Sequence, residues 1–135
     1  MHVQIATYCD SASEYDNRLC ILGTLDTLKA DAWPYRRNHC CVALKLMWGK
    51  SEEGFHTVRV SFMDEDGRPT LEELKSRLKV RVPKDQYFVS SNHVIHLHQL
   101  TFHAAGTYMA TVHVDDVLAQ EIQLQVIDGT GRKKA

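Results

Sequence analysis

Hydrophobic and polar residues alternate with a period of two along most of this chain. The alternation is clearest over residues 42–48, 58–63, 108–114 and 122–126. A period of two indicates β-strands that bury one face and leave the other in solvent, the usual pattern of antiparallel sheets. We therefore predict an all-β chain that folds as a two-sheet antiparallel β-sandwich of about eight strands.

Two segments depart from simple alternation. Residues 18–28 are apolar on both sides, which predicts one central strand that is covered on both faces. In residues 71–77 the leucines recur at helical spacing, so we expect a short helical turn or an irregular loop there, before a strand at 78–82. Acidic turn residues stand at 64–67 and 115–116.

The apolar positions of the alternating strands define the predicted core. Each of these side chains should point into the space between the two sheets. The predicted core residues are Val42, Leu44, Leu46, Trp48, Val58, Val60, Phe62, Leu97, Tyr108, Val112, Ile122 and Leu124.

One stretch resembles the E-to-F corner of immunoglobulin-like sandwiches. The spacing that carries the resemblance is that of Ile95, Leu97, Leu100, Gly106 and Tyr108. The resemblance extends over residues 93–127, the E, F and G strands, and implies a tyrosine corner in which Tyr108 hydrogen-bonds to backbone near residues 102–105. Ala110 stands where antibody-type domains have a disulfide cysteine.

The chain as a whole also resembles a family of small uncharacterised bacterial proteins. The resemblance rests on residues 1–6, on residues 19–24 and on the strand and turn at 59–67. It spans most of residues 1–127 and implies a bacterial origin and a small all-β domain. It implies no activity.

Length and composition indicate one ordinary globular domain. The chain has 135 residues, and a domain of this size buries enough surface to fold without a metal or a disulfide. We expect a sandwich domain over 1–128 and a frayed polar tail over 129–135. The net charge of −1 argues against a nucleic-acid partner, and no apolar run is long enough for a membrane span.

The cysteines bear on the cellular compartment. The chain has four, Cys9, Cys20, Cys40 and Cys41, and none of them forms the C-x-x-C spacing of zinc and redox motifs. The N-terminus lacks the charged and apolar regions of a secretory signal. We therefore expect four free thiols in a cytoplasmic protein.

The histidines raise the question of a metal site. Eight occur, and His96 and His98 should lie on one face of a strand, a geometry that can bind a metal. Two arguments oppose such a site. His113 should lie in the other sheet, and the cations at 77–81 should lie on the neighbouring strand. We therefore expect solvated histidines and no metal or cofactor, with His96 and His98 as the weak candidates.

The sequence contains no catalytic motif. The acidic turn at 64–67 lacks the full ligand series of a calcium-binding loop. A nucleophile elbow and a glycine-rich phosphate loop are both missing. We expect no catalytic residues, no nucleotide cofactor and no enzymatic activity.

These exclusions favour a non-enzymatic module that binds a protein partner or assembles with itself. The strands expected to share one sheet are those at 41–48, 56–63, 106–114 and 119–127. The outer face of that sheet should carry Met47, Met63, Met109 and His113. Methionine is over-used at adaptable binding surfaces, so this face is predicted to mediate a homodimer. The alternative is a metal- or small-ligand-binding sandwich that uses His96 and His98.

Overall fold

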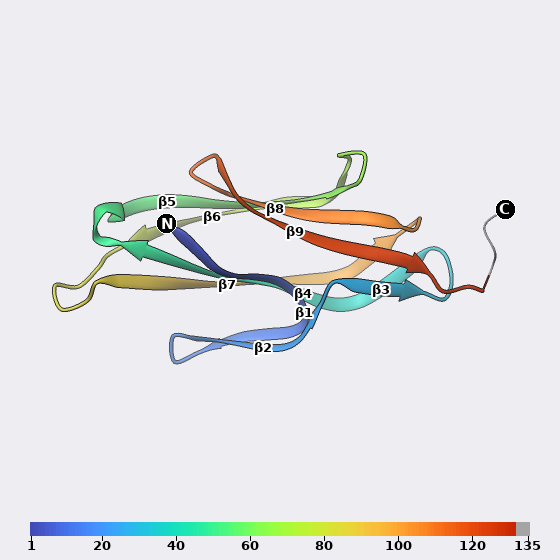
Figure 1. The fold of residues 1–135 in the computed structure, drawn as a ribbon, viewed down its shortest axis with the longest axis horizontal. Helices are drawn as coiled ribbons and strands as arrows, with labels where there is room; N and C mark the ends of the chain where they lie inside the picture. Colours follow the sequence, from blue (N-terminus) through green and yellow to red (C-terminus); the bar gives the residue numbers. More distant parts are fainter. Residues whose placement is uncertain (132–135) are drawn as a thin grey trace.

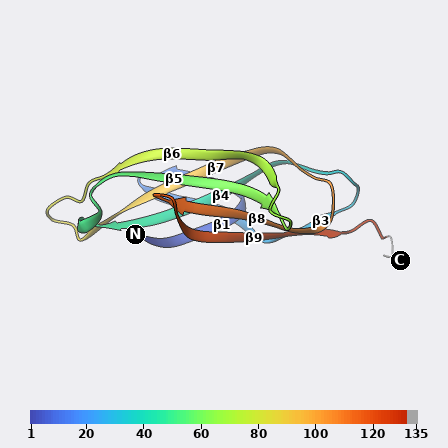
Figure 2. The ribbon, with the colours of Figure 1, turned by 90° about the horizontal axis from the view of Figure 1, so that it is seen from above.

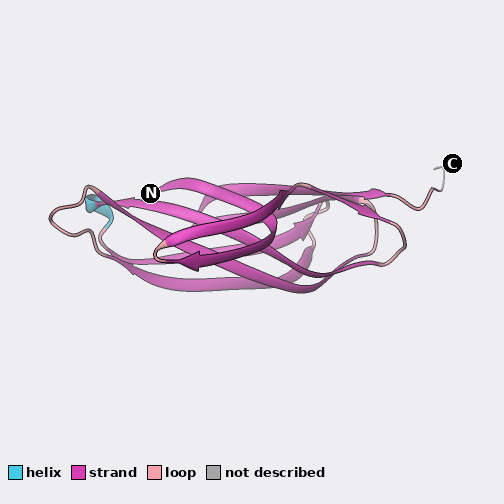
Figure 3. Cartoon of the chain, turned by 90° about the horizontal axis from the view of Figure 1, so that it is seen from below, coloured by secondary structure: helices cyan, strands magenta, loops and turns pink. Residues whose placement is uncertain are grey.

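The computed structural model describes residues 1–131; the last four residues of the predicted tail lie outside the described part. The strands are β1 (His2–Tyr15), β2 (Arg18–Leu25), β3 (Thr27–Ala30), β4 (Tyr35–Gly49), β5 (Gly54–Asp64), β6 (Pro69–Val80), β7 (Phe88–Phe102), β8 (Gly106–Val114) and β9 (Val117–Asp128), and a 3-10 helix, η1, spans Lys50–Glu52. The all-β prediction is confirmed, with nine strands in the described residues (Figure 3). None of the helical structure within residues 1–131 is long and apolar enough to cross a bilayer.

The strands form two layers that face each other (Figures 1 and 2). Sheet A has the strand order β2-β1-β4-β7, and sheet B has the order β3-β9-β8-β5-β6. The pairings are antiparallel apart from that of β3 with β9, which is parallel. The predicted two-sheet sandwich is confirmed, and the parallel pair makes one edge of sheet B mixed.

The hydrophobic core fills the space between the sheets. Leu44 and Leu46 of β4 and Leu124 of β9 are among its most deeply buried side chains. All the predicted core residues are buried in this cluster except Tyr108, which is half-buried and packs against it. The alternation of the sequence therefore placed the inward face of each core strand correctly.

The tyrosine corner is present. The Tyr108 hydroxyl donates a hydrogen bond to the Ala104 carbonyl at 2.6 Å, as predicted. Its ring packs edge-on against Phe102, with 4.7 Å between ring centroids. Burial raises the pKa of the Tyr108 hydroxyl, which keeps it a donor. The contact ties the loop after β7 to β8 and so fixes the crossover between the sheets.

The prediction of one central strand over residues 18–28 is wrong. The segment divides into β2, at the edge of sheet A, and β3, at the edge of sheet B. Leu22 is 72% exposed. The break falls between the two strands at Asp26; Gly23, with a φ of 70°, lies within β2. Apolar residues on both faces of residues 18–28 therefore did not mean that other elements cover both faces.

The prediction of a helical turn or loop at 71–77 is also wrong. These residues belong to β6, which pairs with β5 along its length. Leu74 pairs with Val60, and Leu71 pairs with Phe62. The two leucines are three residues apart, whereas their partners on β5 are two apart. The extra residue is a β-bulge, and a bulge gives leucines the same spacing as a helix.

Candidate metal centre

Four potential metal ligands lie on one patch of the outer face of sheet A. In the β4–β7 pairing, His39 is opposite His98 and Cys41 is opposite His96. Residues two apart on a strand share a face, and residues directly opposite each other lie side by side. The intervening Cys40 and Leu97 point into the core, which directs the four ligand-bearing side chains outward.

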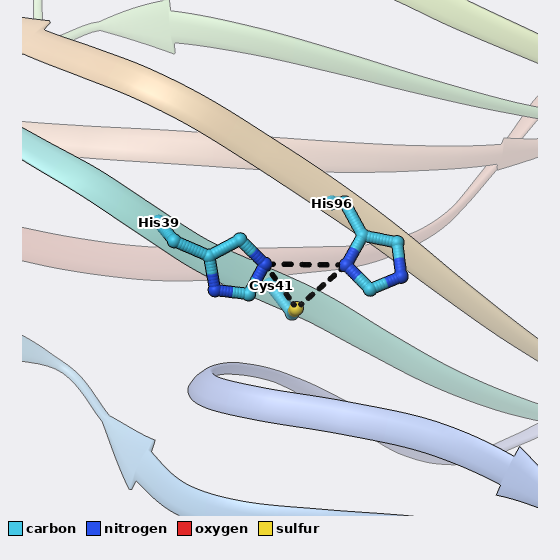
Figure 4. A group of neighbouring side chains, drawn as sticks. All are labelled: His39, Cys41 and His96. Carbon is cyan, nitrogen blue, oxygen red and sulfur yellow. Dashed lines mark hydrogen bonds between the residues drawn. The ribbon is translucent and has the colours of Figure 1, made fainter.

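Three of the four side chains already converge. The His39 Nε2 and His96 Nδ1 atoms are 3.3 Å apart. The Cys41 Sγ atom lies 3.5 Å from His96 Nδ1 and 3.8 Å from His39 Nε2. Figure 4 shows the two rings approaching from β4 and β7, with the sulfur completing a triangle.

This triangle has the dimensions of a zinc site. Zinc binds imidazole nitrogen at about 2.0–2.1 Å and thiolate sulfur at about 2.3 Å. In a tetrahedral site those lengths separate two nitrogens by about 3.3 Å and a nitrogen from the sulfur by about 3.5 Å. The observed triangle therefore matches the expected one without rearrangement, except for a small excess in the distance from Cys41 to His39.

The surroundings make the site open on one side and closed on the other. His39 and His96 are exposed, whereas Cys41 is fully buried. Cys41 belongs to a small second apolar cluster, which forms where the β1–β2 hairpin packs on the outer face of β4 and β7. Its buried members are Cys9, Ala12, Cys41 and Ala43, with Leu19, Ile21 and Val94 packed against them. An ion can therefore approach the two histidines from solvent and reach a thiol that is buried among apolar side chains.

The other cysteines are placed differently. Cys9 lies on β1 directly opposite Cys41. Burial, together with neighbouring Cys41 and Asp10, raises the pKa of the Cys9 thiol to about 11. Cys40 faces the core, where burial raises its pKa to about 11. Cys20 is exposed on β2, and all four thiols are free, as predicted.

The sequence analysis identified two of the four residues of this patch and missed His39 and Cys41. It singled out His96 and His98, but it set a metal site aside because it expected cationic residues 77–81 on the neighbouring strand. That expectation is wrong, because β6 belongs to sheet B and the neighbour of β7 is β4. His39 and Cys41 could have been found from their own spacing, because a His-x-Cys pair also places two metal ligands on one face of a strand. In the structure this pair lies opposite the His-x-His pair of His96 and His98. The expectation that His113 cannot join the site is correct, since it lies in sheet B.

The predicted methionine face is not a single face. Met63 and Met109 are direct neighbours on β5 and β8, and His113 lies further along β8 on the same side. Met47 lies on β4 in sheet A, on the opposite side of the sandwich. The expectation that residues 41–48 share a sheet with the other three strands is therefore wrong. Alternation gives the direction of a side chain relative to its own sheet and does not say which sheet a strand joins.

Two other polar groups prove to be structural. His56 contacts Asp115 through Nδ1 at 2.6 Å and the Glu52 carbonyl through Nε2 at 2.5 Å, so both ring nitrogens are engaged. In the acidic turn, Asp64 Oδ1 accepts hydrogen bonds from the backbone N–H groups of Asp66 and Arg68. This carboxylate closes its own turn, as expected of turn chemistry.

Comparisons with known proteins identify a family and no activity. Residues 4–127 match the model of a family described as one of unknown function. Comparison with curated proteins gives no match. Among solved structures, the chain is similar to a glycosyl hydrolase family 2 member from Bacteroides cellulosilyticus DSM 14838, with 8% identity and a TM-score of 0.39. The similarity covers 76% of this chain and only 16% of that one, and it carries no argument about function.

Proposed function

The chain belongs to DUF6941, a family of unknown function, and we propose that it is a metal-binding β-sandwich whose site takes a zinc-class divalent ion. The ligands are His39 and Cys41 of β4 and His96 of β7. The observation that supports the proposal is the triangle of donor atoms at 3.3, 3.5 and 3.8 Å, which fits one ion at its centre.

The donor set selects the metal. A thiolate and two imidazoles are soft and intermediate ligands, which suit zinc and its neighbours in the transition series. Calcium and magnesium require oxygen ligands, and the triangle contains none. Zinc binding needs Cys41 as a thiolate, so the proposal requires a reduced thiol and agrees with the predicted cytoplasmic location.

The role of the ion is to hold two strands together in a non-enzymatic module. Within residues 1–131, strand β7 is at the edge of sheet A and pairs with β4 alone. An ion shared by Cys41 and His96 cross-links this edge strand to its one neighbour. Because the unfolded chain does not hold the ligands together, binding stabilises the folded state in proportion to the logarithm of metal concentration.

Calorimetric titration of the reduced protein with zinc tests the proposal. We expect one ion per chain for the wild type. Loss of a residue that only orients a metal ligand costs about 10- to 100-fold in metal affinity, so loss of a ligand itself in Cys41→Ser or His39→Ala should weaken binding by more than about 100-fold. Cys20→Ser and His103→Ala are matched controls, because both side chains are exposed and neither belongs to the site. Equal weakening by site and control variants, or a wild type that binds no zinc, would reject the proposal.

A second candidate function is self-association through the outer face of sheet B. Met63 lies directly opposite Met109, and Thr111 is only 5% exposed although it points away from the core. The Thr111 Oγ1 atom is buried and has no hydrogen-bond partner within the described residues. Thr111 is covered by its own chain, so the support for this candidate is the methionine pair, a residue type over-used at adaptable binding surfaces.

A further inference from the structure

We infer that His98 supplies the fourth ligand, so that the bound ion has a closed site of one cysteine and three histidines. This inference rests on the proposed function, and it decides what that site can do. A zinc ion with three protein ligands keeps a position for water or substrate, whereas four protein ligands are typical of structural sites.

The register places His98 within reach of the ion. It lies directly opposite His39 and two residues from His96, on the same face of β7. Its ring centroid is 5.4 Å from that of His39 and 6.4 Å from that of His96. The two histidines of the triangle have ring centroids 5.5 Å apart.

These distances can be compared with those of a loaded site. With nitrogen–zinc bonds of about 2.0–2.1 Å, two imidazoles on one tetrahedral ion have ring centroids about 5 Å apart. The spacings of His39 to His96 and of His39 to His98 are both within about 0.5 Å of this value. Only the distance from His96 to His98 is longer, by about 1 Å, which a rotation of the His98 side chain can close.

His98 is also free to make that movement. It is exposed, its ring lies beside those of His39 and His96, and within residues 1–131 its side chain makes no hydrogen bond or ion pair. The next residue, Gln99, has a φ of 54°, a region that residues other than glycine rarely adopt. Conformations of this kind cluster at ligand sites, where the strain is offset by binding.

Closure of the site by His98 has a functional consequence. The ion would carry no exchangeable water, so it would neither activate a nucleophile nor bind a substrate. Four ligands in a square of facing residues, two on each strand, would instead fix the register of β4 against β7. The site would then hold the ion tightly and stabilise the edge of sheet A.

Cobalt substitution tests whether His98 or water holds the fourth position. Reduced wild-type protein titrated with Co²⁺ should show a thiolate-to-cobalt charge-transfer band together with the intense visible d–d bands of four-coordinate cobalt. His98→Ala should keep the charge-transfer band, because Cys41 still binds. It should shift the d–d bands, because a water oxygen replaces an imidazole nitrogen. The bound cobalt should then enhance the relaxation of solvent water protons, which the closed wild-type site should not do, and the affinity should fall at least about tenfold.

The controls separate the two proposals. His103→Ala should reproduce the wild-type spectrum, and circular dichroism of the metal-free His98→Ala variant should match that of the wild type. If His98→Ala keeps both the wild-type d–d bands and the wild-type relaxation of solvent water protons, with or without a loss of affinity, the fourth ligand is not His98 and the three-residue site stands. If the wild type shows no thiolate charge-transfer band, the site itself is wrong.

Discussion

At the scale of single residues, His56 shows how the fold uses a histidine that is not a metal ligand. Asp115, the backbone carbonyl of Glu52 and the charge on Glu52 surround the ring. The hydrogen bond that His56 Nδ1 donates to Asp115 is the largest of the influences that raise the pKa of His56. The pKa of Asp115 is lowered first by the hydrogen bond from the Thr57 backbone N–H and then by the one from His56. The ring is therefore held as a cation that bridges the start of β5 and the β8–β9 turn.

This pair predicts a pH-dependent contribution to stability. The folded pKa of His56 is raised, so the stabilisation is complete below the unfolded value of about 6.5 and is lost as the pH rises through the folded value. Asp115→Asn keeps a residue that favours the turn and one acceptor for the Thr57 N–H, and it removes the charge and the acceptor that faces His56. Urea unfolding should show a cost of up to about 1 kcal/mol near pH 6, because Asp115 is half exposed, and a smaller cost near pH 9. A cost that is the same at both pH values would contradict the ion pair.

At the scale of the elements, β4 supplies several of the most deeply buried side chains of the core. Leu44 on β4 is fully buried, whereas Leu22 on the edge strand β2 is 72% exposed. Leu44→Ala should lower the free energy of unfolding by about 2–5 kcal/mol, since it removes buried methyl groups and leaves a cavity. Leu22→Ala, the matched control, should change it by less than about 0.5 kcal/mol. Similar losses in chemical denaturation would mean that the inward face of β4 is misassigned.

The strands themselves were largely predictable from the sequence, and their neighbours were not. Period-two alternation identified β4, β5, β8 and β9 and the phase of each, because burial on one face leaves a local trace in the chain. The bulge in β6 and the division between β2 and β3 left no such trace. Both depend on which strand lies alongside, and that is a long-range property.

The same limit explains the candidate site. His96 and His98 were visible as a pair because both lie on one strand. Their relation to His39 and Cys41 depends on the β4–β7 register, which joins residues 55 or more positions apart in the chain. A site built across two strands is therefore found only when the pairing is known.

At the scale of the whole molecule, the two outer faces of the sandwich differ. Sheet A carries the proposed metal centre and the β1–β2 hairpin, and sheet B carries the pair of Met63 and Met109. We expect Met63→Lys combined with Met109→Lys to shift a dimer to monomer in light scattering without loss of the fold. Met47→Lys, on the opposite side, is the control and should leave the dimer intact. A wild type that is monomeric at high concentration would remove the dimer, and a shift caused by the control would place it on sheet A.

The proposed metal centre requires one ion between β4 and β7, with Cys41 as a ligand. X-ray absorption at the zinc edge of the zinc-loaded protein measures this directly. We predict one sulfur neighbour at about 2.3 Å and a shell of imidazole nitrogens at about 2.0–2.1 Å. The sulfur contribution should disappear in Cys41→Ser and remain in Cys20→Ser. A zinc environment of nitrogen and oxygen alone in the wild type would contradict the account.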